Sequence, residues 1–424
     1  MDGLVNGVDG APAPSMSEAV GTRRLKAQLR RAGRARRLGA LALVAPLLLF
    51  VLLTFAIPIT GMLWKSVDDR DVARIMPRTV AALAAWEGDG LPGDAAFRAL
   101  AADLGEARQR GTLAMAARRL NYDINGFRTL MFSSTRRLPA ADAPDIKAQF
   151  IALDARWGGA ESWAAIKRAA GPLTSFYLLA ALDLHRDAAG EVVAVPADHA
   201  IYRDVLVRTF RISLTVTLLC LALGFPLAYV LAVEPPRRAN LLMILVLLPF
   251  WTSLLVRTSA WVVLLQSEGV VNRLMIWLGL IDEPLRLIYN AVGVHVAMTH
   301  VLLPFMILPL YSTMKAIPPT YMRAAASLGA PPGSAFFRVY LPQCLPGIGA
   351  GCLLVFILAI GYYITPALVG GAADQMISYF IAFYVSDSVN WGMASALGAV
   401  LLAATLLLYG VYSRLVGGGA IRMG

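Results

Sequence analysis

The sequence contains little cysteine and few acidic residues: 3 cysteines among 424 residues, and 27 aspartates and glutamates against 38 lysines and arginines. Cys220, Cys344 and Cys352 have the spacing of neither a metal site nor a disulfide framework. The chain also lacks a phosphate-binding glycine loop, a zinc motif and a nucleophile elbow. We therefore expect no catalytic residue, no metal site and no cofactor in this chain, and we predict that it is not an enzyme.

Long apolar segments are the main feature that is present. Hydrophobic residues make up 58% of the chain, and the mean hydropathy is +0.63. A helix needs about 20 apolar residues to cross a bilayer. The composition predicts an all-α polytopic membrane protein with six transmembrane helices, over 38–64, 212–233, 239–266, 287–314, 346–371 and 389–413. The first segment is too long for the core of a signal peptide, so we interpret it as an anchor.

Acidic residues are absent from the interior of these six segments. Proton- and sodium-driven secondary transporters often carry Asp or Glu deep in a span, so this absence argues against that class. A membrane scaffold without a transport role is a third interpretation. A neighbouring gene for an ATPase would exclude both alternatives.

Basic residues near the ends of the segments predict the orientation of the chain. The tail over 1–37 carries eight of them, which places it in the cytoplasm, and six spans return residues 417–424 to the same side. The even-numbered connections agree, because they also carry basic residues: Arg237, Arg238, Lys315, Arg323 and Arg338.

The net charge of +11 does not indicate nucleic-acid binding. Between Lys65 and Asp204 we count 18 basic and 18 acidic residues, so the excess comes from the rest of the chain, mostly from the tail and the cytoplasmic connections. Membrane orientation and anionic lipid explain a charge with this distribution. The basic tail has no interleaved aromatic residues, so we expect contact with the lipid bilayer and none with nucleic acid.

The connection over 65–205 is unusually long, and we predict a compact α-helical periplasmic insertion. Helices are expected over 95–121, from a cap at Asp142 or Asp145 through Trp157, over 161–170 and over 175–185. A small aromatic core is expected from the following residues: Trp86, Phe132, Phe150, Trp157, Trp163, Phe176 and Tyr177. The insertion either contacts a partner or packs over the outer mouth of the chain's own membrane domain. Two further external connections, 267–286 and 372–390, have apolar residues typical of segments at the membrane surface.

Residues 318–346 form a polar-edged loop between the fourth and fifth spans. Two prolines favour a helix start with Thr320 as its cap, and the alanine-rich stretch 321–328 favours a helix. Gly329 suits the left-handed end of that helix, and Pro331 and Pro332 suit the first turn of a second, strongly apolar one. Such a helical hairpin is suited to insertion into a partner's groove, although an ordinary connector packed on the chain's own spans has the same chemistry.

The loop resembles the EAA loop of ABC importer permeases. The residues that match its pattern, and that this resemblance implies for coupling to an ATPase, are Ala324, Ala325, Gly329, Val339, Leu341 and Pro342. Arg323 stands where the family has Glu. Exposed ion pairs contribute under about 1 kcal/mol, so we expect Arg323→Glu to leave assembly largely intact.

Three further segments, 247–266, 279–290 and 364–371, are similar to the polyamine branch of these permeases. The resemblance covers about half of the chain and assigns 206–416 to a permease core. It implies a subunit of a spermidine/putrescine importer in the bacterial inner membrane. Its implied partners are a dimer of ATPase subunits that hold ATP and magnesium, a second permease and a periplasmic solute-binding protein. An opine, an amino acid, ferric iron, thiamine or an anion is the alternative solute.

A cationic solute favours aromatic faces, carboxylates and carbonyl groups. The pathway residues that we predict are Phe250, Trp251, Arg257, Tyr362, Tyr363 and Asp374. Interfacial packing is the alternative role for each aromatic residue, and a solvated loop position for Asp374. Arg257 either has a function within the membrane or extends to its outer surface. We expect His295 and His300 to be core residues with satisfied hydrogen bonds.

Overall fold

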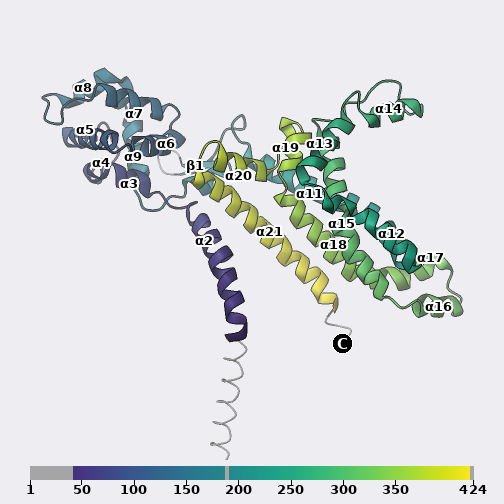
Figure 1. Ribbon diagram of the computed structural model, residues 1–424. Helices are drawn as coiled ribbons and strands as arrows, with labels where there is room; N and C mark the ends of the chain where they lie inside the picture. The colour runs from purple at the N-terminus through teal and green to yellow at the C-terminus, as the bar shows by residue number, and fades with distance from the viewer. Residues whose placement is uncertain (1–41, 187–190, 421–424) are drawn as a thin grey trace, which may run out of the picture. The chain divides into compact units, whose positions relative to one another are not determined.

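Helices dominate the computed structural model of the chain, which describes residues 42–186 and 191–420 (Figure 1). The predicted basic tail over 1–37, the first four residues of the first span and residues 421–424 lie outside the described residues. Within the described part, six helices are long and apolar enough to cross a membrane. They are Ala42–Trp64, Tyr202–Val233, Leu254–Trp277, Ala291–Ala316, Pro332–Gly361 and Trp391–Arg414. The predicted fold class, an all-α polytopic membrane protein, is therefore confirmed.

The first span belongs to a unit of its own, residues 1–62, and we describe it by itself. It is helical from Ala42 and ends at Trp64, the residue at which the sequence predicts its end. A π-helical turn, η1 (Leu52–Ala56), interrupts it before α2 (Ile57–Trp64).

The insertion that follows is a bundle of short helices around its own core. The helices are α3 (Arg70–Ile75), α4 (Pro77–Leu83), α5 (Asp94–Gln109), α6 (Leu113–Asp123), α7 (Phe127–Arg136), α8 (Ile146–Leu153), η2 (Ala155–Gly158), α9 (Ala160–Arg168) and α10 (Phe176–Ala180). Phe150, Trp157 and Trp163 are fully buried in this core, and Trp86 and Phe132 pack against it, as predicted. The Trp157 indole N–H donates to Ser134 Oγ at 2.8 Å, which satisfies the polar end of a buried ring.

Four local predictions in the insertion are wrong. The predicted helix over 95–121 is two helices, because Gly111 has a φ of +70° between α5 and α6. Asp145 precedes α8, but its side chain makes no capping hydrogen bond. The helix predicted over 175–185 is only α10, and its last two predicted residues belong to β1 (Leu184–Arg186), which pairs with β2 (Val192–Ala194). Phe176 and Tyr177 pack not in the insertion core but with α20 (Ile377–Ser386) and α21 (Trp391–Ala420).

A buried ion-pair cluster connects the start of the insertion to its middle. Arg119 donates from Nε and Nη2 to the Asp69 carboxylate, both at 2.6 Å, and from Nη1 to Asp123 at 2.8 Å. Burial raises the pKa of Asp69, and the hydrogen bonds from Arg119 act in the opposite direction. The Arg119 guanidinium also lies 4.9 Å from the centre of the Phe176 ring. Removing one member of such a cluster would leave an uncompensated buried charge, so these residues hold the fold of the insertion together.

The insertion also packs on the membrane domain of its own chain. The Tyr177 ring lies so close to Gly392, near the start of α21, that a Cβ at Gly392 would come within 2.5 Å of it. Arg118 of α6 also donates to the carbonyl oxygen of Val389 at 3.4 Å. Of the two interpretations that the sequence allows, the structure supports packing on the chain itself.

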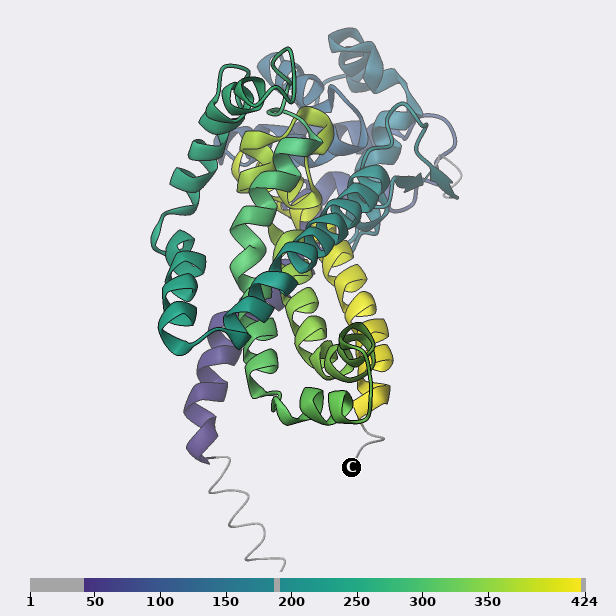
Figure 2. The same ribbon diagram turned by 90° about the vertical axis from the view of Figure 1, so that its right-hand side faces the viewer.

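Three long helices form the centre of the membrane domain: α11 (Tyr202–Val233), α15 (Ala291–Ala316) and α18 (Leu341–Gly361). Figures 1 and 2 show them side by side. Glycines permit their close approach, as is usual between membrane helices. A Cβ at Gly347 of α18 would lie 2.6 Å from Thr313 Oγ1 of α15.

Two predicted spans are interrupted, and a third begins earlier than expected. The predicted span over 239–266 is α12 (Pro236–Leu247), a 3-10 turn η3 (Leu248–Trp251) and α13 (Leu254–Leu265). Pro249 lacks the N–H that a continuous helix requires, and Thr252 and Ser253 are extended. The third helix of membrane-crossing length therefore runs from α13 into α14 (Val270–Trp277).

The predicted span over 346–371 ends early, because α18 stops at Gly361 and a short α19 (Ile364–Val369) follows. The second span begins at Tyr202 rather than Ile212, so α11 crosses the predicted boundary between the insertion and the permease core at 205/206.

The close approach of α15 and α18 gives a testable prediction. We expect Gly347→Ala to lower stability by about 1–3 kcal/mol, because the added methyl group would also lie 3.1 Å from the Pro309 carbonyl oxygen. Gly398→Ala in α21 is the matched control, since a Cβ there has no neighbour within 4 Å. Thermal unfolding of the detergent-solubilised protein measures the difference, and equal midpoints for the two variants would contradict this packing.

Candidate functional site

Four of the predicted pathway residues lie at the two interruptions in the membrane helices. Phe250 and Trp251 lie in η3, and Tyr362 and Tyr363 separate α18 from α19. Trp251 is 75% exposed, whereas Phe250 and Tyr363 are each 42% exposed. Backbone at membrane depth leaves the helical conformation only where it is buried in protein or lines a cavity. The interruptions are therefore the two places in this domain where the α-helical backbone pattern breaks between apolar helices.

A hydrogen bond joins the helices that follow the two interruptions. Thr258 of α13 and Thr365 of α19 are both fully buried, and their Oγ1 atoms are 3.2 Å apart. Phe250 itself packs against Phe305 of α15, with 5.0 Å between ring centroids. Both interruptions are thus attached to the same central part of the domain, α15 together with the α13–α19 pair.

Ser378 of α20 completes the second interruption. Its hydroxyl lies 3.2 Å from the Ile360 carbonyl oxygen and 3.0 Å from that of Tyr362, so it donates to backbone oxygens that the end of α18 leaves without helical partners. Sequence reasoning misses Ser378, because a serine in an apolar segment gives no local indication of a partner so far away in the sequence.

Arg257 lies one turn into α13 and is partly buried. Within the described residues, its Nε atom is buried and has no hydrogen-bond partner. The guanidinium therefore faces the protein interior rather than extending freely to the outer surface.

The two histidines of the fourth span have partners, in line with the core role that we favour. His300 Nδ1 accepts from the Trp261 indole N–H at 3.1 Å. The Nδ1 atom of His295 is 2.6 Å from the Ala291 carbonyl oxygen. Among the residues that the structure describes, no cluster of His, Cys, Asp and Glu has the composition of a metal site.

Asp374 has a local structural role. Its Oδ2 atom accepts from the backbone N–H of Gly371 at 3.1 Å, at the start of the 3-10 turn η5 (Ala372–Asp374). The adjoining backbone is also held, because the Tyr289 N–H donates to the Val369 carbonyl oxygen at 2.8 Å. Asp374 therefore shapes the connection between α19 and α20, with one carboxylate oxygen already in use.

We use the name coupling hairpin for residues 318–346. Its first helix, α16 (Thr320–Ser327), is present as predicted, and Gly329 has the expected left-handed φ of +80°. Thr320 is the first residue of the helix rather than its cap, so that prediction is wrong. The second helix is not a separate short one. It begins with α17 (Pro332–Ala335) and continues through a π-helical turn, η4 (Phe336–Tyr340), directly into α18.

This continuity makes the coupling hairpin a rigid extension of the fifth span. Aromatic contacts fasten it to α11 as well: Tyr229 lies 5.5 Å from Tyr340 and 6.1 Å from Phe336, measured between ring centroids. In Figures 1 and 2 the hairpin lies at the end of α15 and α18 opposite to α14. A displacement of the hairpin would therefore be transmitted along α18 to the interruption at Tyr362.

The predicted coupling residues are divided between surface and interior. Exposed positions are Arg323, Ala324, Gly329 and Pro342; Val339 and Leu341 are partly buried, and Ala325 is buried. The two apolar side chains of the hairpin with the highest exposed fractions are not part of the motif. Leu328 is 88% exposed and Phe337 is 67% exposed. An apolar residue directly before the corner glycine is the sequence feature that would have identified Leu328.

Comparison with known proteins identifies the class. Residues 224–417 match the family model of the binding-protein-dependent transport system inner membrane component. The chain belongs to this family, whose members are permease subunits of ABC importers, and it is a multi-pass inner-membrane protein. The match begins within α11, so the insertion lies outside it.

Individual relatives resemble this chain over its membrane domain. It is 35% identical over 219 residues to the spermidine/putrescine transport system permease protein PotB of Escherichia coli (strain K12), covering 51% of this chain and 80% of that protein. The PotB of Haemophilus influenzae is 37% identical over 214 residues, covering 50% and 75%. A crystal structure of a bacterial alginate ABC transporter aligns with a TM-score of 0.43 at 16% identity, over 50% of this chain and 77% of that one.

Ser378 gives the second prediction. Ser378→Ala would leave the carbonyl oxygens of Ile360 and Tyr362 without their donor, at a cost of about 1–3 kcal/mol. We expect faster amide hydrogen exchange over residues 360–365, measured by mass spectrometry in detergent. Ser386→Ala, at the exposed end of the same helix, is the control. Unchanged exchange in Ser378→Ala would show that this hydroxyl does not stabilise the interruption.

Proposed function

We propose that this ABC importer permease carries polyamines, with spermidine and putrescine as its solutes. The observation that supports this most strongly is the similarity to the spermidine/putrescine permease of Escherichia coli, which extends over 80% of that protein at 35% identity. The matching part contains both helix interruptions beyond α11 and the coupling hairpin, the two features on which transport and coupling would depend.

In this proposal the aromatic side chains at the two interruptions contact the cation. Trp251, Phe250 and Tyr363 are exposed at positions where the backbone is not α-helical, and aromatic faces attract ammonium groups. Arg257 would repel an ammonium group from its side of the path. Conduction requires binding that is weak enough to release the solute, and a nearby positive charge limits how long a cation stays.

The energy for transport would come from other chains. We propose that a pair of ATPase subunits holds ATP and magnesium and binds the coupling hairpin through Leu328, Phe337 and the motif residues. A second permease would complete the path, and a periplasmic binding protein would deliver the solute. The coupling hairpin and both termini would then be cytoplasmic, and the insertion periplasmic, as the basic residues near the spans predict. Closure of the ATPases would move the hairpins and rock the spans between two orientations.

Arg257 favours a second candidate within the same class. A guanidinium with a buried, unpartnered Nε is a recognition group for carboxylates, which it binds through two parallel hydrogen bonds. A solute with a carboxylate, such as an opine or an amino acid, is therefore the alternative to a polyamine. The two candidates differ in the sign of charge that the path must accept.

Uptake measurements on two single tryptophan variants test the polyamine proposal. We expect Trp251→Ala to reduce uptake of radiolabelled spermidine by about threefold to thirtyfold, the range that a cation–π contact of roughly 0.5–2 kcal/mol predicts. Trp277→Ala, which removes a tryptophan that is 80% exposed on α14, is the matched control at equal expression. An inactive ATPase partner should abolish uptake.

Two results would contradict this proposal. Uptake that an excess of an amino acid or opine blocks, but an excess of putrescine does not, would support the carboxylate solute. Uptake that persists with the inactive ATPase would reject an ATP-driven importer altogether.

The coupling hairpin gives a separate prediction about assembly. We expect Leu328→Asp to reduce co-purification of the ATPase at least about tenfold, because it places a charge on an apolar side chain that is 88% exposed. Ser327→Asp, at the adjacent exposed position, is the control, and Arg323→Glu should retain association. Normal association of Leu328→Asp would show that the ATPase does not bind this corner of the hairpin.

A further inference from the structure

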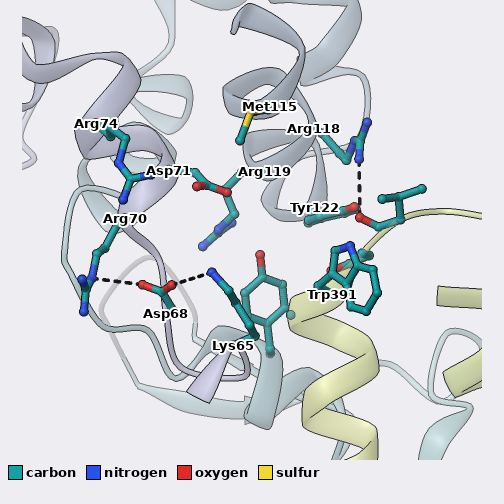
Figure 3. Close-up of a pocket in the computed structure, with 14 residues that line it drawn as sticks. Lys65, Asp68, Arg70, Asp71, Arg74, Met115, Arg118, Arg119, Tyr122 and Trp391 are labelled. Atoms are coloured by element: carbon teal, nitrogen blue, oxygen red, sulfur yellow. Dashed lines mark hydrogen bonds and ion pairs between the residues drawn. The ribbon is translucent and has the colours of Figure 1, made fainter. Parts of the chain in front are cut away.

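A pocket lined by charged side chains lies outside the proposed solute path. The pocket, of about 430 Å³, lies between the insertion and the start of α21, lined by α3, α6 and residues 389–392 (Figure 3). Its charged side chains come from the start of the insertion, from α3 and from α6. Its basic residues are Lys65, Arg70, Arg74, Arg118 and Arg119, and its acidic residues are Asp68 and Asp71.

Most of these charges are already paired. Lys65 and Arg70 share Asp68, at 2.9 and 3.2 Å, and Arg119 is held by the buried carboxylates described above. Arg74 and Arg118 form no ion pair among the described residues, and both side chains are exposed. With Asp69 and Asp123 included, five positive charges face four negative ones. The pocket therefore has an excess of one positive charge, and Arg74 and Arg118 are its two arginines without a carboxylate partner among the described residues.

The ends of two spans place this pocket at the surface of the bilayer. Lys65 directly follows the span Ala42–Trp64, and Trp391 begins the span Trp391–Arg414. Trp64 and Trp391 are both about half exposed, which is the usual state of tryptophans at the level of the lipid headgroups. A ligand at this depth can have its charged group in the pocket and its apolar part beside exposed apolar side chains of α21, such as Leu402.

We propose that this pocket binds a phosphate ester, and that the source of the phosphate is the headgroup of an anionic phospholipid. A phosphodiester carries the single negative charge that the pocket lacks. Arginine is suited to it, because its planar guanidinium donates two parallel hydrogen bonds to phosphate oxygens. Arg74 comes from α3 of the insertion and Arg118 from α6, where it already approaches the Val389 carbonyl oxygen.

Bound lipid would strengthen the attachment of the insertion to the last span. The direct contacts there are mainly apolar, with Phe176 and Tyr177 packed on the first turns of α21, and the long hydrogen bond from Arg118 lies beside them. A phosphate between Arg74 and the start of α21 would add a charged link at the same place. The site is independent of the solute, so it does not depend on the polyamine proposal.

Lipid binding to the full-length protein tests this inference. Native mass spectrometry in a neutral detergent would measure binding of dioleoyl phosphatidylglycerol, with dioleoyl phosphatidylcholine for comparison. We expect the double variant Arg74→Gln/Arg118→Gln to weaken phosphatidylglycerol binding about thirtyfold, from the contribution of two basic residues near a membrane surface. Arg98→Gln/Arg137→Gln is the matched control, because it removes two exposed arginines of the insertion that lie outside the pocket.

The outcomes separate the possible ligands. Phosphatidylglycerol binding that glycerol 3-phosphate does not displace at millimolar concentration, and that only the Arg74/Arg118 variant loses, supports the lipid site. Displacement by glycerol 3-phosphate or inorganic phosphate would overturn the lipid and assign a soluble phosphate. Equal losses in both double variants, or equal binding of phosphatidylcholine, would overturn the pocket as a site.

Discussion

Backbone N–H and C=O groups inside a bilayer have no water to bind, so each needs a hydrogen-bond partner within the protein, and the rest of this structure depends on that constraint. The membrane domain meets it with long helices, and the exceptions are the two helix interruptions. Each exception has specific support: Ser378 donates to the backbone oxygens at the end of α18, and the Thr258–Thr365 pair joins the helices that follow. Asp374 and the Tyr289 N–H complete the polar connections beyond α19. Irregular backbone in this domain is thus stabilised by side chains from other helices.

A continuous helix connects the coupling hairpin to this irregular region. The run from α17 through η4 into α18 begins at the exposed corner and ends at Gly361, next to Tyr362. A separate short helix would bend at its junction and absorb a displacement, whereas an unbroken one transmits it. The close packing of α18 on α15 at Gly347 and Gly351 leaves little space for the two helices to slide without repacking. In the proposed mechanism, the mechanical link between the ATPases and the solute path would run through α18, the helix that also organises the core.

The insertion has a different physical basis from the membrane domain. Its core is aromatic and compact, and a buried arginine with two carboxylates connects its first residues to α6. It lies outside the family match, and a hydrophobic cluster near the start of α21 attaches it to the membrane domain. The charged pocket at this junction would add a polar link to that apolar attachment.

The sequence by itself determined the class of fold, five of the six spans to within a few turns, and the helix, glycine and proline pattern of the coupling hairpin. These features follow from local chemistry: apolar length, basic residues near span ends, and the backbone preferences of glycine and proline. Pro249 was a visible indication of the first interruption, but an apolar run of that length outweighed it. Only the tertiary structure decided that α18 ends at Gly361, that Tyr177 packs on Gly392, and that Arg74 and Arg118 share a pocket with Trp391. Those features depend on partners tens to hundreds of residues away, and no local pattern records which distant side chain will satisfy a given backbone group or charge.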